Sequence, residues 1–118
     1  MPAGTYNITI EQGATFRLRL TLRLPNDPDP MNLSNHIARM QIRQKVASET
    51  IIYSLTTENG GIELGGIAGT IDLFISDEDT AQFTIRSGVY DLEIEAVPNG
   101  DVIRVIEGQV RVSPEVTR

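Results

Sequence analysis

The sequence contains no cysteine and no tryptophan, and it has one histidine and one lysine in 118 residues. Without cysteine, disulfides and thiolate chemistry are excluded, and the usual zinc sites of Cys and His cannot be built. No run approaches the ~18–20 apolar residues of a membrane-spanning helix. The first fifteen residues carry no basic residue, so no secretory signal is predicted. We expect a complete cytoplasmic translation product with no membrane contact.

Basic residues are also scarce, because sixteen Asp and Glu outweigh ten Lys and Arg and give a net charge of −6. A nucleic-acid-binding protein needs a basic face to neutralise phosphates, so no nucleic-acid partner is expected. The length suits one domain over residues 1–118. A chain of this size buries enough surface to fold without a metal or a disulfide.

What the sequence has in abundance is alternation with a period of two. Over residues 15–24, five apolar side chains alternate with Thr and Arg, which places the apolar groups on one face of a strand. Shorter runs with β-strand character follow, and turn-forming residues separate them. The clearest turns are the proline-rich loop 25–30, Asn59-Gly60-Gly61 and the hairpin turn 98–101. The predicted strands cover 15–24, 37–43, 51–56, 62–64, 71–75, 90–96 and 102–112.

This pattern of seven or eight short amphipathic strands predicts an all-β fold, an antiparallel β-sandwich of the Ig-like or jelly-roll-like kind. Whether the sheets close into a barrel is left open. The runs 62–64 and 71–75 are expected to form a hairpin. One short helix is predicted near 77–83, where Ser76 offers a capping hydroxyl and acidic residues fill the first turn. Gly108 interrupts the last strand and suggests a β-bulge there.

Few residues offer catalytic chemistry. His36 is the only imidazole, and a turn residue before a strand explains it better than a catalytic base does. The acidic run 77–79 is explained as a helix cap rather than a cation site, and the glycine pairs 60–61 and 65–66 as turns rather than a phosphate cradle. We therefore predict a protein that is not an enzyme and that has no catalytic residue, cofactor or metal.

Charged residues gather in two stripes on predicted strands. One stripe is basic and the other acidic, and each has two interpretations. Cross-strand pairing within a sheet accounts for such stripes at a few tenths of a kcal/mol per pair. Alternatively the stripes bind partner subunits, since Arg is enriched at protein interfaces. The candidate partner-binding residues are Arg17, Arg19 and Arg23 in the basic stripe and Asp91, Glu93 and Glu95 in the acidic stripe.

An ordered set of segments across nearly the whole chain carries a family resemblance. The set comprises Tyr6–Phe16, Ala38–Arg43, Leu55–Ile62, Gly88–Ile94, Gly100–Arg104, Gly108–Val110 and Ser113–Arg118. It resembles small structural proteins of tailed bacteriophages and prophages. More loosely, it also resembles the N-terminal β-domain that attaches receptor-binding proteins to lactococcal-type phage baseplates. The proline-rich loop 25–30 departs from this pattern and is a candidate variable contact surface.

The resemblance implies a non-enzymatic structural component of a virion, located in the tail or baseplate, that joins a fibre or a neighbouring subunit. Its expected partners are other phage structural proteins and copies of itself, and its expected location is the virion, assembled in the host cytoplasm. One alternative is a capsid or neck decoration protein. The other is a carbohydrate-binding module for a host surface glycan, which the absence of tryptophan and the few tyrosines disfavour. A depolymerase ranks last.

Overall fold

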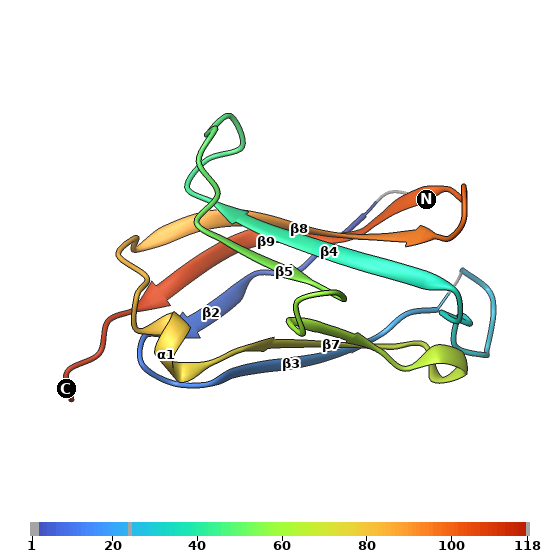
Figure 1. The fold of residues 1–118 in the computed structure, drawn as a ribbon, viewed down its shortest axis with the longest axis horizontal. Helices are drawn as coiled ribbons and strands as arrows, with labels where there is room; N and C mark the ends of the chain where they lie inside the picture. Colours follow the sequence, from blue (N-terminus) through green and yellow to red (C-terminus); the bar gives the residue numbers. More distant parts are fainter. Residues whose placement is uncertain (1–2, 24, 118) are drawn as a thin grey trace.

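Two β-sheets pack face to face in the computed structural model, which describes residues 3–23 and 25–117 (Figure 1). In the larger sheet the strand order is β1 (Gly4–Thr5), β9 (Val102–Ser113), β8 (Ser87–Ala96), β4 (His36–Arg43) and β5 (Tyr53–Thr56), and β2 (Ile8–Glu11) also pairs with β9. In the smaller sheet the order is β3 (Phe16–Thr21), β7 (Thr70–Ile75) and β6 (Ile62–Leu64). A 3₁₀ turn, η1 (Gly66–Ala68), and a short helix, α1 (Asp77–Thr80), flank β7.

The predicted β-sandwich is confirmed, and period-two alternation is the reason. In β8, Leu92 and Ile94 are almost fully buried, while Glu93 between them faces outward. In the smaller sheet, the inward side chains of β7 reach 0–1% exposure. The core between the sheets comprises Ile8, Ile10, Leu33, Ala38, Met40, Ile42, Leu55, Ile62, Ile71, Leu73, Ile75, Phe83, Tyr90, Leu92, Ile94, Val105, Val110 and Val112.

The N-terminal segment adds strands that the alternation pattern did not resolve, which brings the described residues to nine strands. Both β1 and β2 pair with β9 in parallel, so the sandwich is not wholly antiparallel. Ile8 and Ile10 are buried at 5% and 0% exposure. The Tyr6 amide donates to the Glu107 carbonyl at 2.9 Å, which keeps the segment on β9 between the two short strands.

The bulge predicted at Gly108 lies elsewhere. The register between β8 and β9 shifts between Leu92 and Glu93, and the unpaired residue is Val105, which is buried. Gly108 has a different role, because a Cβ there would lie 2.3 Å from the Tyr6 carbonyl oxygen. The glycine therefore permits the close approach of the N-terminal segment to β9.

Helix α1 is shorter than the predicted span 77–83 and ends at Thr80. Ser76 caps it as expected, since its hydroxyl accepts from the Asp79 amide. Beyond Thr80 the amides of Gln82 and Phe83 donate to carbonyls three residues back, so the chain continues as tight turns. These turns bring Phe83 into the core at 4% exposure.

The predicted hairpin and the predicted turn before the last strand are both present in the structure. Residues 62–64 and 71–75 form the expected antiparallel hairpin, and 97–101 connects β8 to β9. Residues 25–29 are exposed, as expected for the proline-rich loop, and Leu24 of the predicted strand 15–24 lies outside the described residues. In the described part of the chain, no helix has the length and apolar character needed to cross a membrane.

Candidate interaction surfaces

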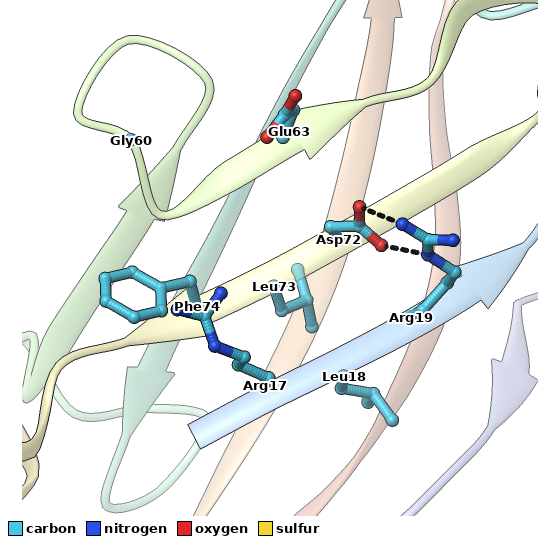
Figure 2. A pocket seen from close by; sticks show the side chains of 8 residues that line it. All are labelled: Arg17, Leu18, Arg19, Gly60, Glu63, Asp72, Leu73 and Phe74. Atoms are coloured by element: carbon cyan, nitrogen blue, oxygen red, sulfur yellow. Dashed lines mark hydrogen bonds and ion pairs between the residues drawn. The ribbon is translucent and has the colours of Figure 1, made fainter. Parts of the chain in front are cut away.

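The basic stripe lies on the outward face of the smaller sheet, where β3, β7 and β6 present alternate side chains (Figure 2). Five of these residues line an open depression of about 490 Å³, and we call this surface the small-sheet face. The register sets Arg17 opposite Phe74 and Arg19 opposite Asp72. The small-sheet face consists of Arg17, Arg19, Glu63, Asp72 and Phe74.

Arg19 and Asp72 form a two-pronged ion pair across β3 and β7 (Figure 2). The Arg19 Nε lies 2.7 Å from Asp72 Oδ1, and the Arg19 Nη2 lies 3.0 Å from Asp72 Oδ2. The hydrogen bond from Arg19 lowers the pKa of Asp72, and the same bond raises the pKa of Arg19. Because the Arg19 side chain is 69% exposed, the pair holds the guanidinium in a fixed position without withdrawing it from solvent.

Arg17 has a different contact. Its guanidinium carbon lies 4.6 Å from the centre of the Phe74 ring, a cation–π distance (Figure 2). Among the described residues no ion pair to Arg17 is found, so its charge is not neutralised in the way that the charge of Arg19 is. Arg23 is exposed beyond the end of β3, where its backbone bridges to Pro30.

The acidic stripe lies on the outward face of the larger sheet, which we call the large-sheet face and define by Arg39, Asp91, Glu93, Glu95 and Arg104. Arg39 on β4 bridges two acids of β8, with Nε 3.1 Å from Glu93 and Nη1 2.9 Å from Glu95. The hydrogen bond to Glu95, followed by that to Glu93, raises the pKa of Arg39. Two of the three acidic stripe residues are therefore paired with Arg39.

The third acid, Asp91, is held less tightly. Its nearest cation is Arg104 on β9, with Arg104 Nε 3.5 Å from Asp91 Oδ2. Burial raises the pKa of Asp91, and the opposing attraction of Arg104 is smaller. Asp91 lies in an open depression of about 740 Å³ that spans β4, β8 and β9. This depression is the larger of the two charged hollows.

The two predicted stripes lie on different sheets and face away from each other, because each occupies the outward side of its layer. Each stripe contacts opposite charges within its own sheet, so cross-strand pairing accounts for Arg19 and for the three acids Asp91, Glu93 and Glu95. Partner binding by Arg17, Arg19, Arg23, Asp91, Glu93 and Glu95 stays a prediction. Sequence reasoning missed Asp72 and Arg104 as ion-pair partners. The β3–β7 register sets Asp72 opposite Arg19, and the β8–β9 register places Arg104 opposite Glu93, two residues from Asp91.

The histidine lies outside both faces, and Phe74 is the aromatic residue that belongs to one of them. His36 begins β4, and its Nδ1 lies 3.0 Å from the carbonyl oxygen of Ser34 rather than from a hydroxyl. Tyr90 and Phe83 are buried, and burial raises the pKa of Tyr90 to about 12. Tyr53 is half-buried and donates to Asp79. In the described residues, no three acidic or histidine side chains gather as a metal site would require.

Comparison with known proteins identifies the fold alone. No family model and no curated protein matches the chain. A crystal structure of a chicken TCR is similar with a TM-score of 0.57 and 11% identity, over 94% of this chain. The chain spans 54% of that TCR chain. The extracellular domain of the voltage-gated sodium channel beta4 subunit, described as a parallel homodimer, is similar with a TM-score of 0.51 and 14% identity, over 98% of this chain and 97% of that one. These likenesses support an Ig-like β-sandwich.

Proposed function

We propose that this protein is a non-enzymatic structural component of a tailed-phage virion, a tail or baseplate protein that joins a fibre or a neighbouring subunit. The observation that carries the proposal is where the resembling segments lie. Five of them, 6–16, 38–43, 88–94, 100–104 and 108–110, contribute to adjacent strands β2, β9, β8 and β4. Most of the resembling segments therefore follow one continuous sheet, as expected of a shared assembly domain, while 55–62 and 113–118 lie mainly in a turn and in the C-terminal tail.

Homotypic contact is part of the proposal, and the large-sheet face supports it. Arg43 and Glu107 lie beside the large-sheet face. With these two residues, the surface carries three arginines and four acids, so both signs of charge are mixed on it. A two-fold related copy must meet the same patch, so a face with both signs can be self-complementary. The parallel homodimer described for the beta4 subunit is a precedent within the same fold.

The direct test is the composition of the particle. Virions from the phage or induced prophage that encodes this chain are purified and analysed by quantitative mass spectrometry. We expect the chain in a fixed ratio to a baseplate or tail protein, and gold-labelled antibody at the tail. Label on tailless heads would favour the decoration-protein alternative. Absence of the chain from particles, with the protein abundant in the lysate, would contradict the proposal.

A charge reversal tests whether the basic stripe takes part in assembly. Arg19→Glu places a third carboxylate beside Asp72 and Glu63 on an exposed surface, so we expect the domain to stay folded. Incorporation into particles should fall, whereas Arg111→Glu, the same change on exposed β9 outside both stripes, should incorporate normally. Equal incorporation of both variants would remove the basic stripe from the assembly contacts.

Light scattering tests the homotypic contact separately. If the large-sheet face meets a second copy through ion pairs, the mean mass should rise with protein concentration and fall again with added salt. Arg104→Glu should weaken this association, because it removes the cation nearest to Asp91. A strictly monomeric chain at all concentrations would leave only heterologous partners.

A further inference from the structure

Strand β3 is paired on one side only. It ends the order β3-β7-β6, and among the described residues no strand pairs with its other side. Beyond its end, the Leu22 amide donates to the Gly69 carbonyl at 2.8 Å, which fixes the hydrogen-bonding phase of this antiparallel pair. Because main-chain groups alternate in direction along such a pair, those of Arg17, Arg19 and Thr21 point away from β7, toward the open edge.

The opposite side of β7 confirms this phase. The Phe74 amide donates to the Gly61 carbonyl at 2.9 Å, and the Thr70 carbonyl accepts from the Gly65 amide at 2.9 Å. The main-chain groups of Thr70, Asp72 and Phe74 on β7 therefore bond toward β6. Those of Ile71, Leu73 and Ile75 bond toward β3. Three successive donor and acceptor pairs on β3 remain available to an added strand.

The side chains along this edge are incompletely covered. The inward residues of β3, Phe16, Leu18 and Leu20, are only half-buried, although they pack against the core. By contrast, the inward residues Ile71 and Ile75 of the neighbouring β7 are 0% exposed. An additional strand beside β3 would bury its apolar side chains to the same degree, which adds apolar contact to main-chain hydrogen bonding.

Three of the usual protections of an exposed edge are missing from β3. Edge strands are commonly blocked by proline, by a bulge, by a charged side chain on the inward face, or by outward charges along the strand, and only the last of these is present in β3. Residues 16–21 have no proline, their register with β7 is continuous, and their inward side chains are all apolar. The charges on β3 point outward, where they select a partner rather than prevent pairing.

Charge decides which occupant fits. A second copy of β3, added antiparallel and centred anywhere from residue 17 to 21, would set at least one of Arg17, Arg19 or Arg23 beside an arginine of the other copy. Like charges directly opposite destabilise a sheet. Asp or Glu in the same positions would instead meet Arg17, whose charge is not paired among the described residues, and the exposed Arg19.

We propose that β3 is a docking edge that accepts an extended segment of a partner protein by antiparallel strand addition, and that apolar residues alternate with Asp or Glu in that segment. This inference does not depend on a virion location. Main-chain hydrogen bonds supply affinity in such complexes, and alternate side chains supply specificity. The apolar residues extend the half-covered core, and the acids lie on the small-sheet face.

Amide hydrogen exchange tests the edge directly. In dilute protein the amides of Arg17, Arg19 and Thr21 should exchange rapidly, while those of Leu18 and Leu20 are protected. A synthetic eight-residue peptide that alternates Glu with Val and Ile should slow the first three by at least about ten-fold, the factor of a 1.4 kcal/mol stabilisation. A peptide that alternates Arg with Val and Ile should leave them unchanged.

Proline scanning provides a matched pair of variants. Thr21→Pro removes an amide that faces the open edge and leaves the bonds from β3 to β7 in place, so the domain should fold and lose peptide binding. Thr21→Ala should keep both properties. A second measurement does not depend on the stability of the variant. The Glu peptide N-methylated on the amides that face β3 should fail to bind, whereas methylation of the other amides should be tolerated.

Three outcomes would overturn the proposal. Equal protection by the Glu and Arg peptides would show that charge does not select the occupant. Protected amides at Arg17, Arg19 and Thr21 in dilute protein would show that the edge is already covered. Protection that rises with protein concentration without peptide would identify a second copy as the occupant. Each result leaves the particle-composition experiment unaffected, so the two proposals fail separately.

Discussion

Thr80 is, apart from the Tyr90 phenol, the only buried polar side chain among the described residues, and its removal tests how the start of β3 is held. Its hydroxyl accepts from the Gly13 amide at 3.0 Å and donates to the Ala14 carbonyl at 2.9 Å, with the Asp77 carbonyl at 3.1 Å. Thr80 thereby joins α1 to the turn that leads into β3. Thr80→Val keeps the shape of the side chain and removes both bonds to this turn.

The magnitude follows from those bonds. A buried group left without its partner costs about 1–3 kcal/mol, and Gly13 is only half-buried, so we expect Thr80→Val to lower the free energy of unfolding by about 1–2 kcal/mol. Unfolding entropy near 2.1 cal/mol/K per residue amounts to ~0.25 kcal/mol/K for this chain. The melting temperature should therefore fall by about 4–8 °C.

Calorimetry and amide exchange check this prediction together. Thr80→Ser is the matched control, because it keeps the hydroxyl and removes only a methyl group. In Thr80→Val the Gly13 amide should lose its protection, and in Thr80→Ser it should remain protected even if the melting temperature falls. If Thr80→Val has the melting temperature of the wild type and its Gly13 amide exchanges as slowly as in the wild type, the Thr80 hydroxyl does not hold the turn and the reasoning is refuted.

Three further predictions concern packing and titration. Gly108→Ala places a Cβ 2.3 Å from the Tyr6 carbonyl oxygen, so urea titration should show a loss of about 1–3 kcal/mol, with faster exchange of the Tyr6 amide. Unchanged stability would mean that β1 is not held against β9. The hydrogen bond from Arg19 lowers the pKa of Asp72, so this carboxylate stabilises the fold above the unfolded pKa, and the contribution is lost as pH falls through the folded pKa. Arg19→Gln should raise the pKa of Asp72 in an NMR titration, and an unchanged pKa would refute the pairing. Burial raises the pKa of Tyr90 to about 12, so its contribution to stability, present below the unfolded pKa, should be lost as pH rises toward 12. Tyr90→Phe should reduce the alkaline dependence in denaturation curves and leave the part contributed by Tyr53, whose pKa burial also raises to about 12.

Local patterns were sufficient to predict much of the fold. Arg17 and Arg19 alternate with apolar residues, and a strand is the structure that separates them onto two faces, as β3 does. Ser76 followed by acids predicted a capped helix, and the capping bond is present. In both cases the determining residues are neighbours in sequence, so the signal needs no knowledge of the tertiary fold.

Features set by distant contacts could not be predicted in this way. The parallel pairing of Ile8 and Ile10 with β9 joins segments about a hundred residues apart, and no local periodicity encodes it. Gly108 suggested a bulge because a glycine in a strand often marks one. The actual reason for a glycine at this position is the close approach of Tyr6, which can be recognised only when both segments are placed in the fold. The pairing of Arg104 with Asp91 likewise depends on the bulged register at Val105.

The position of the N-terminal segment also explains why one edge of the smaller sheet, at β3, has no neighbouring strand among the described residues. A strand that enters beside both sheets can pair with the edge of either one. Here burial of Ile8 and Ile10 favours pairing with β9, and Gly108 leaves room for the close approach because it has no side chain. The β9 side of the larger sheet is thus covered, and β3 keeps one unpaired side in the smaller sheet. The features that stabilise the first pairing are therefore the same features that leave an edge of alternating arginine and apolar residues for another chain.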